Sequence, residues 1–153
     1  DEMLSEVKKS LPVDLAVCVA AVTDFKPVIK SKIKIKKENI NFNSINYVKN
    51  NDILEYICKH NKYRPRLVAG FSAETNDVTK NSINKMKRKH CDIIFANNVS
   101  QKNIGFNSDY NKVSVIDKKG NVKIIPKNKK SFIANKIAEI LLDKLLIDDR
   151  NIN

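Results

Sequence analysis

The sequence predicts an α/β fold: a doubly wound, mainly parallel Rossmann-like sheet to which one β-hairpin is added. Three apolar runs of strand length, at residues 14–22, 66–71 and 92–96, are typical of strands buried on both faces of a parallel sheet. A helical pattern precedes each of the last two runs. Two alternating segments around a glycine turn near residue 120 predict the hairpin.

The N-terminal segment is expected to contain a helix and then the first strand. Residues 1–10 are interpreted as the end of a helix, because Leu4 and Val7 share one face and Pro12 closes the pattern. The apolar run at residues 14–22 follows directly and is the first predicted strand.

The next segment changes from polar to alternating and then to helical. Residues 23–37 are polar and rich in lysine, whereas residues 40–42 and 45–47 alternate as half-buried strands do. Asn50 or Asn51 can cap the following helix. Its apolar positions are Ile53, Leu54, Ile57 and Cys58.

The middle of the chain repeats the order of strand and helix. After the strand at 66–71, Thr75 or Asn76 can cap a long helix that ends near residue 89, and the strand at 92–96 follows. This alternation predicts parallel strands joined by helical crossovers.

The C-terminal part is expected to add a loop, a hairpin and a helix. Residues 97–111 are loop-like, and residues 112–117 and 121–125 alternate around the turn. A helix over 131–146 places one apolar stripe on its surface. The stripe contains Phe132, Ile133, Ile137, Ile140, Leu141 and Leu145.

The charge of the chain raises the question of an anionic partner. Lys and Arg number 29 and Asp and Glu 17, so the formal net charge is +12. Lysine occurs 25 times and arginine 4 times, although nucleic-acid readers favour arginine for bidentate contacts. Most lysines are therefore interpreted as a solvated surface that reflects A/T-rich codons. A basic RNA- or DNA-binding module remains the alternative.

Several classes of protein are not indicated by the sequence. No apolar stretch approaches the about 20 residues that span a bilayer, and the first residues do not form a signal peptide, so a cytoplasmic protein without membrane contact is expected. The three cysteines lack the spacing of a zinc site. The three glycines form neither a GxGxxG turn nor a Walker loop.

Polar segments at the ends of the predicted strands indicate a site for a phosphorylated ligand. In doubly wound sheets ligands bind beyond the carboxyl ends of the strands. Asp24 follows the first strand, and the lysines at 34–37 could neutralise phosphoryl oxygens and close over a nucleotide. The same lysines could instead protect an exposed edge strand.

Four further segments suit a nucleotide. The helix beginning near Asn51 offers free backbone N–H groups, and Gly70 and Phe71 precede a strand-to-helix turn. Lys85 and Lys89 share one helix face because they are four residues apart. Polar residues at 96–100, with the loop beyond them, could seat a ligand or form an ordinary Asx-rich turn.

Taken in order, the motifs resemble one family. They are AAVTDF at 20–25, KIKK at 34–37, VKNNDI at 48–53, GFSAET at 70–75, Lys85 with Lys89, ANNVSQ at 96–101 and GFNSDYN at 105–111. This series closely resembles the phosphopantothenate–cysteine ligase family, the second domain of the bifunctional coenzyme A biosynthesis flavoprotein. The resemblance runs from about Asp14 to Leu146.

The resemblance implies a reaction and its participants. Such a ligase activates the carboxylate of 4′-phosphopantothenate with CTP and Mg²⁺ to an acyl-cytidylate, and the amine of cysteine then attacks to form the amide. The resemblance also implies a homodimer that binds no nucleic acid. It implies flap and dimerisation strands at about residues 26–48. FMN is expected only if a decarboxylase domain precedes this chain. The choice between CTP and ATP stays open.

The resemblance also implies the residues of the site. Lys34 matches the flap lysine that stabilises charge on the activated intermediate and is the predicted catalytic residue. The metal ligands are not indicated. The implied nucleotide-binding residues are Cys18, Val19, Ala20, Asp24, Lys34, Asn51, Asp52, Ile53, Leu54, Phe71, Lys85 and Lys89.

The chain is expected to be one ligase domain over residues 1–153 that lacks the N-terminal part of the family's domain. That part carries a Gly-rich turn and an Asn/Ser/Gly segment that handle phosphopantothenate and the second half-reaction. The 153 residues alone are therefore expected to hold CTP without completing ligation. A non-catalytic subunit with the same fold is a further alternative.

Overall fold

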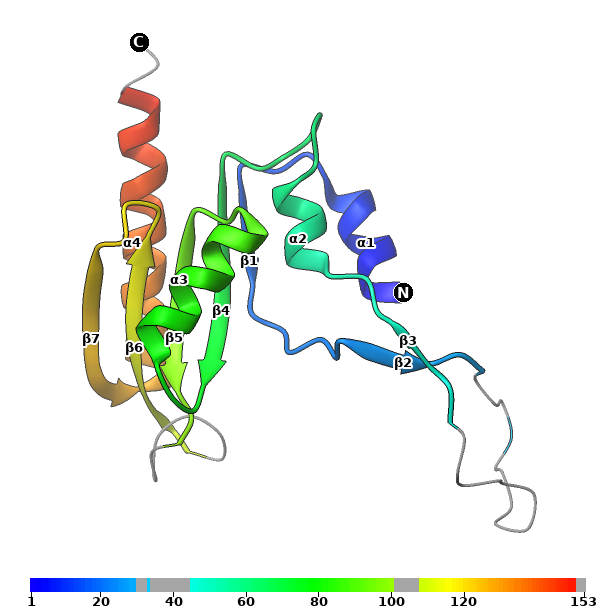
Figure 1. Ribbon diagram of the computed structural model, residues 1–153. Coiled ribbons are helices and arrows are strands. Elements are labelled where there is room, and N and C mark those ends of the chain that lie inside the picture. The colour runs from blue at the N-terminus through cyan, green and yellow to red at the C-terminus, as the bar shows by residue number, and fades with distance from the viewer. Residues whose placement is uncertain (30–32, 34–44, 101–107, 151–153) are drawn as a thin grey trace.

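Two sheets and four helices form the part of the chain that the computed structural model describes, residues 1–29, 33, 45–100 and 108–150. The larger sheet has five strands in the order β1-β4-β5-β6-β7, and the smaller sheet pairs β2 with β3 (Figure 1). The α/β class predicted from the sequence is confirmed.

The first three strands of the larger sheet are parallel, as predicted. β1 (Leu15–Cys18) pairs with β4 (Leu67–Glu74), which pairs with β5 (Ile93–Asn98). Most side chains of β4 and β5 are buried, because helices cover both faces of these central strands. Both strands run farther than their apolar runs, so Asn97 and Asn98 belong to β5 and not to a loop.

The prediction of a long strand over 14–22, buried on both faces, is wrong. β1 has only four residues, and it is an edge strand within the described sheet. Ala16 and Cys18 pack against the cluster that includes α2, whereas Val17 points to the other face and is 38% exposed. An apolar run reports β-propensity, but its burial depends on neighbours elsewhere in the chain.

The predicted hairpin is confirmed. β6 (Tyr110–Asp117) and β7 (Val122–Lys129) pair antiparallel and extend the sheet from β5. Gly120 has φ +81°, a conformation that favours glycine. The carboxylate of Asp117 accepts hydrogen bonds from the backbone N–H groups of Lys119 and Asn121 at 2.9 and 3.0 Å, which fixes the turn.

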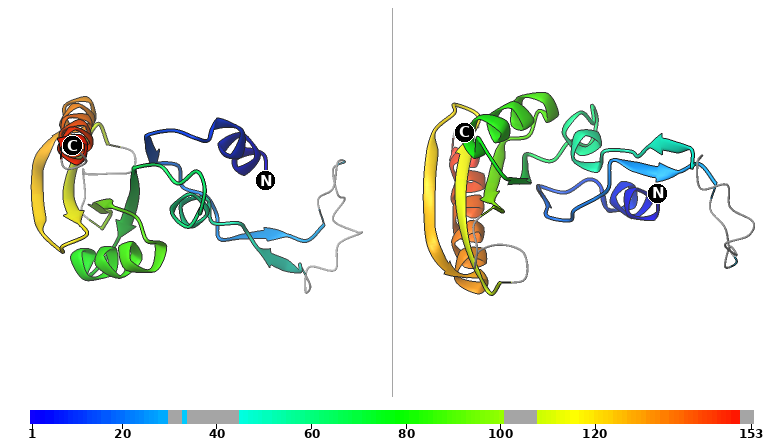
Figure 2. Two further views of the ribbon diagram at one scale, coloured as in Figure 1. Left: turned by 90° about the horizontal axis from the view of Figure 1, so that it is seen from above. Right: turned by 60° about the horizontal axis from the view of Figure 1, so that its bottom comes forward.

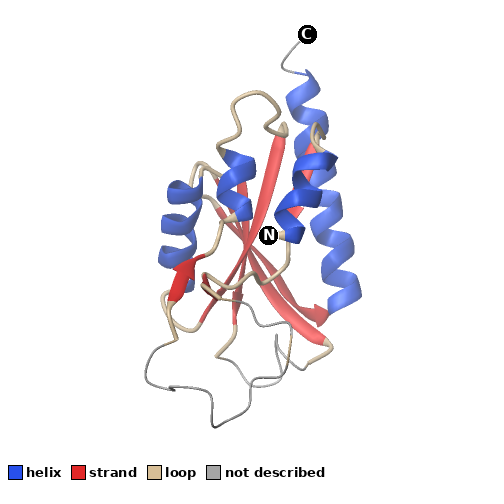
Figure 3. Cartoon of the chain, turned by 90° about the vertical axis from the view of Figure 1, so that its right-hand side faces the viewer, coloured by secondary structure: helices blue, strands red, loops and turns tan. Residues whose placement is uncertain are grey.

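Helices lie on both faces of the larger sheet (Figures 2 and 3). α2 (Ile53–Cys58) and α3 (Val78–Lys89) cover one face, and α4 (Lys130–Arg150) covers the other. α1 (Glu2–Ser10) lies beside α2, as predicted for residues 1–10. The arrangement confirms the doubly wound topology.

Helix boundaries differ from the sequence predictions in detail. Asp52 caps α2 in place of Asn50 or Asn51, because its side chain accepts the Glu55 N–H. Asp77 precedes α3 in a left-handed conformation, so neither Thr75 nor Asn76 is the cap.

The last helix begins at Lys130 and ends at Arg150, so it is longer than predicted. Ile133, Ile137 and Leu141 are buried against the sheet as its stripe predicts, but Phe132 is 42% exposed and does not belong to the buried face.

The smaller sheet projects from the body of the molecule (Figure 1). β2 (Phe25–Pro27) pairs antiparallel with β3 (Tyr47–Lys49), so only the last residue of the predicted strand at 45–47 forms a strand. The predicted strand at 40–42 and the lysines at 34–37 lie outside the described residues. Phe25, Ile29 and Tyr47 are largely exposed on this projection.

Candidate functional site

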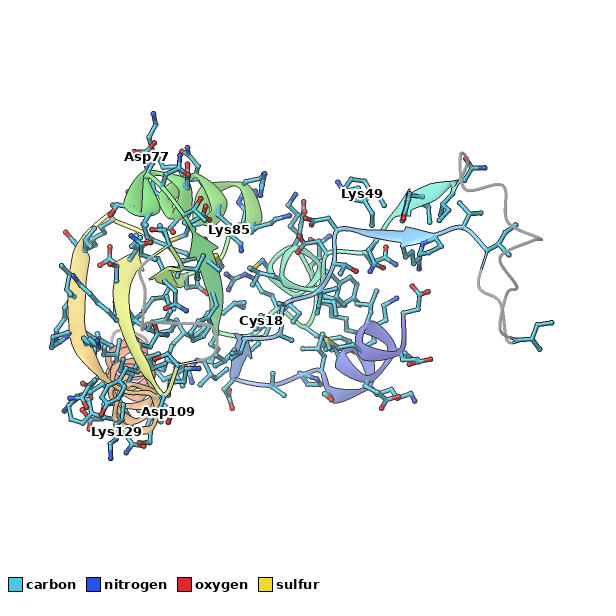
Figure 4. All side chains as sticks on the ribbon, turned by 90° about the horizontal axis from the view of Figure 1, so that it is seen from below. Cys18, Lys49, Asp77, Lys85, Asp109 and Lys129 are labelled. Carbon is cyan, nitrogen blue, oxygen red and sulfur yellow. The ribbon has the colours of Figure 1, made fainter. Side chains whose placement is uncertain are left out.

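A cleft opens beyond the carboxyl ends of β1 and β4, and together with the space that continues along α4 it has a volume of about 1870 Å³. It is lined by residues that follow β1, by the start of α2, by the end of β4 and by one face of α3. Figure 4 views this end of the sheet, with Lys85 on α3 and Cys18 at the end of β1. The location agrees with the rim that the sequence predicts.

The cleft brings together every predicted nucleotide-binding residue that the structure describes. Lys34, the predicted catalytic residue, lies outside the described residues. The residues that line the cleft are Cys18, Val19, Ala20, Asp24, Asn51, Asp52, Ile53, Leu54, Phe71, Lys85 and Lys89.

Gly70 allows α2 to approach the sheet closely. A Cβ atom at this position would lie 2.7 Å from Leu54 Cδ2, which is shorter than any normal contact. Leu54 itself is buried in the core beneath the start of α2. The glycine therefore positions the N-terminus of α2 over the end of β1 and β4, where the cleft opens.

Asn50 joins the segment after β1 to the start of α2. Its backbone N–H donates to the carbonyl of Asp24 at 2.7 Å, and its side-chain Nδ2 donates to the carbonyl of Thr23 at 3.1 Å. The Asp24 residue is exposed at the mouth of the cleft. These two bonds fix the backbone at Thr23 and Asp24, and Asp24 lines the cleft.

Lys89 is held by two carboxylates at the start of α2. Its Nζ atom lies 2.5 Å from Asp52 Oδ2 and 2.9 Å from Glu55 Oε2. The Lys89 side chain is 11% exposed. Asp52 also accepts the Glu55 N–H at 2.8 Å, and Glu55 pairs with Lys59 at 2.6 Å. Lys89 therefore ties α3 to α2 in addition to lining the cleft.

The ion pairs of this cluster change its pKa values. Burial acts to raise the pKa of Asp52, but hydrogen bonds from Lys89 and from the Glu55 N–H outweigh it and lower the pKa. Hydrogen bonds from Lys59 and then Lys89 lower the pKa of Glu55 to about 2. Burial opposes the charge of Lys89, yet Asp52 and Glu55 raise its pKa. All three groups are charged at neutral pH.

At acid pH, the stability of the protein should depend on Glu55. Because its pKa is lowered on folding, Glu55 contributes stability above its ordinary pKa, and this contribution is lost as pH falls toward about 2. We therefore expect Glu55→Gln to flatten the fall in melting temperature between about pH 5 and pH 2. The matched control is Glu6→Gln in the exposed pair with Lys9, which should leave the profile unchanged. An unchanged profile for Glu55→Gln would contradict the pairing.

Lys85 faces the same cleft but is less constrained. Its Nζ atom donates to the Phe71 carbonyl at 2.9 Å, which leaves further N–H donors of the ammonium group for a ligand. The ring of Phe71 lies on the opposite face of the sheet, with its centroid 5.2 Å from that of Phe95. The carbonyl of Phe71, and not its ring, therefore faces Lys85.

One polar residue of this rim and two side-chain pairs were not predicted from the sequence. Glu55 was overlooked, although the spacing of Asp52 and Glu55 is that of a capping box and could have indicated it. Ser72 Oγ donates to Glu74 Oε1 at 2.5 Å at the end of β4. Asn111 Nδ2 donates to Asn97 Oδ1 at 3.3 Å across β5 and β6. Ser72 and Glu74 share one face of β4 because they are two residues apart, so the strand period could have indicated this pair. The Asn97–Asn111 pair is formed by the fold and has no signal in the local sequence.

The described residues contain no group of three His, Cys, Asp or Glu side chains placed to hold a metal ion. Magnesium that accompanies a nucleotide needs only one or two carboxylates, because phosphate oxygens and water complete its shell. Asp24 and Glu74 both line the cleft and carry oxygen donors of this kind. Across the same residues, no helix has the length and apolar character needed to cross a membrane.

An α/β sheet with a lysine-lined cleft at its carboxyl rim defines the class of α/β domains that bind a ligand beyond the carboxyl ends of their strands. The chain belongs to the family of the DNA/pantothenate metabolism flavoprotein C-terminal domain, whose sequence model matches residues 1–145.

Two curated relatives are similar over most of the chain. The coenzyme A biosynthesis bifunctional protein CoaBC of Borreliella burgdorferi is 39% identical over 129 residues, which cover 84% of this chain and 32% of that protein. CoaBC of Escherichia coli K12 is 36% identical over 136 residues, or 86% of this chain and 32% of that protein. The chain thus spans about a third of the length of these relatives.

A solved structure agrees with the fold. The crystal structure of the C-terminal domain of the coenzyme A biosynthesis bifunctional protein CoaBC superposes with a TM-score of 0.72 at 25% sequence identity. The match covers 96% of this chain and 62% of that chain.

Proposed function

We propose that the chain is the nucleotide-binding part of a phosphopantothenate–cysteine ligase. In the proposed reaction, the carboxylate of 4′-phosphopantothenate attacks the α-phosphate of CTP, and pyrophosphate leaves. The amine of cysteine then attacks the acyl-cytidylate, which forms the amide and releases CMP. The observation that carries the proposal is the cleft, where the motif residues of four separate segments meet.

The proposed roles follow from the position of each group. Lys85 has donors available at the rim and neutralises phosphate oxygens as charge develops. The Asp52 carboxylate already accepts the Glu55 N–H. The N–H groups that stay free at the start of α2 bind the nucleotide. Lys89 is a positioning residue, because it fixes α2 to α3. Lys34 is proposed to stabilise charge on the activated intermediate.

Magnesium fits the same site. Bound to the triphosphate, it would supply charge neutralisation on the phosphate oxygens, and Asp24 or Glu74 would hold it from the protein side. Both carboxylates lie on the rim, where phosphates could meet them.

We further propose that the two-stranded sheet belongs to a flap and dimerisation segment at about residues 26–48. The support is its position away from the larger sheet (Figure 1) and the exposure of its apolar side chains. Apolar surface of this kind is typical of contacts with another chain. The partner proposed here is a second copy of the same protein.

Calorimetric titration with CTP, ATP and UTP tests the nucleotide site. CTP is expected to bind more tightly than UTP, and Lys34→Gln is expected to weaken the binding. Single-stranded RNA of mixed sequence is the control, and its affinity should be low. Equal binding of CTP and UTP with no effect of Lys34→Gln would contradict the proposal. Affinity for RNA that falls steeply with salt would support a nucleic-acid-binding module instead.

A further inference from the structure

The face of α3 that lines the cleft carries a cation that the sequence-based prediction of the site did not include. Arg88 lines the cleft together with Asn81, Asn84 and Lys85. These residues recur at spacings of three and four, so they share one face of the helix. Arg88 is exposed, and its guanidinium group carries five N–H donors in a planar fork.

Lys89, the next residue, is occupied by the protein itself. Its Nζ atom lies 2.5 Å from Asp52 Oδ2 and 2.9 Å from Glu55 Oε2, and its side chain is 11% exposed. These two carboxylates offset the charge of the ammonium group. Lys89 therefore adds no net positive charge to the cleft, although the sequence resemblance implied that it binds the nucleotide.

Arg88 is not occupied in this way. Within the part of the chain that the structure describes, its guanidinium group forms no ion pair or hydrogen bond. Arg64 provides the contrast, because it donates to the carboxylate of Asp92 and to the carbonyls of Cys58 and His90. A cation that lines a cleft without a partner in the protein is available to an anionic ligand.

The position of Arg88 along α3 suits a ligand that extends along the cleft. Lys85 lies at the end of β4 (Figure 4), where its Nζ atom donates to the Phe71 carbonyl at 2.9 Å. Lys89 marks the other end, because it contacts Asp52 at the start of α2. Arg88 lies on the helix between these two places. An anion that meets Lys85 and extends toward α2 would therefore meet Arg88.

We infer that Arg88 binds the polyphosphate chain of the nucleotide together with Lys85. This inference rests on the proposed nucleotide site and deepens it. A triphosphate carries more negative charge than one ammonium group neutralises, and a guanidinium group can donate to two phosphate oxygens at once. Arg88 thus contacts the ligand, whereas Lys89 acts through the position of α2.

The basic end of α3 also has a simpler explanation. Lys87, Arg88 and Lys89 all lie in the last turn of the helix, where a cation interacts favourably with the helix dipole. That explanation makes Arg88 and Lys87 equivalent, because both are exposed. Only Arg88 of these two lines the cleft. The pair therefore separates ligand binding from a general effect of charge.

Calorimetric titration of the full 153-residue chain with CTP tests the inference. Arg88→Gln is expected to weaken CTP binding about tenfold, because it removes a charge-assisted contact with phosphate. Arg88→Lys should weaken it about threefold, since an ammonium group keeps the charge but lacks the planar fork. Inorganic triphosphate should compete with CTP, and Arg88→Gln should raise the concentration required about tenfold.

Lys87→Gln is the matched control and should leave CTP affinity within about twofold of the wild type. The melting temperature of every variant should stay unchanged, because neither side chain holds another part of the fold. Wild-type affinity in Arg88→Gln, or an equal loss in Lys87→Gln, would overturn the inference while leaving the nucleotide site in place. Unchanged competition by inorganic triphosphate would also overturn it. Absence of CTP binding to the wild-type chain would instead overturn the proposed nucleotide site, and this inference with it.

Discussion

Replacing Lys89 by methionine is expected to weaken CTP binding at least about tenfold and to lower the stability of the protein. Methionine keeps much of the aliphatic length but removes the ammonium group. Asp52 and Glu55 would then lose the cation that joins them to α3. Two carboxylates without that cation repel one another and repel a triphosphate, so both the start of α2 and the electrostatics of the cleft would change.

The expected loss of stability is about 2 kcal/mol, below the about 3–5 kcal/mol typical of breaking a fully buried pair. The reason is that Asp52 and Glu55 are 31% and 33% exposed, so that water partly screens them. Urea unfolding would measure the stability and calorimetry the affinity.

Two other lysines on α3 separate the effect on CTP binding from the effect on stability. Lys85→Met should reduce CTP affinity with little change in stability, because the Lys85 ammonium group donates to the Phe71 carbonyl and does not stabilise a carboxylate among the described residues. Lys87→Met, an exposed change on the same helix, should affect neither quantity. If Lys89→Met resembled Lys87→Met in both measurements, the positioning role of Lys89 would be refuted.

Asp92→Ala is expected to destabilise the protein by about 3 kcal/mol. The Asp92 side chain is 10% exposed and accepts hydrogen bonds from the Val68 N–H at 2.7 Å and from Arg64 Nη2 at 2.9 and 3.0 Å. Arg64 also donates to the carbonyls of Cys58 and His90. The network joins the turns before β4 and β5. Its loss would leave the buried Val68 N–H without the Asp92 acceptor and the Arg64 guanidinium without its carboxylate.

The other cation beside Asp92 provides the control. Lys118 also contacts this carboxylate, but its side chain is 61% exposed. Lys118→Gln should therefore change the free energy of unfolding by less than about 0.5 kcal/mol. The proposed nucleotide site lies at the opposite end of the strands, so CTP affinity measured below the melting temperature should survive Asp92→Ala. A stability close to wild type would show that the network contributes little.

Local patterns in the sequence were sufficient for the central elements of the fold. The apolar runs that form β4 and β5 have helical segments before them, and the turn at Gly120 has the residue that its φ requires. The motif residues that the structure describes lie along one rim, as expected, because carboxyl ends of parallel strands meet there.

Long-range contacts could not be predicted in the same way. Val17 lies in an apolar run, but its exposure depends on whether anything covers β1. Lys89 was expected to face phosphates, and its pairing with Asp52 depends on how α3 packs beside α2. Residues 37 positions apart carry no mutual signal in a single sequence, so only the fold brings them together.

Mapping the amide shifts of the isotope-labelled chain while CTP is added tests the proposed nucleotide site most directly. Binding in the cleft predicts that residues 18–20, 51–54 and 71 shift together with a single dissociation constant, and that the exposed strand β7 does not respond. Shifts confined to β7 and the scattered surface lysines, or no shifts at millimolar CTP, would contradict the assignment of the nucleotide site.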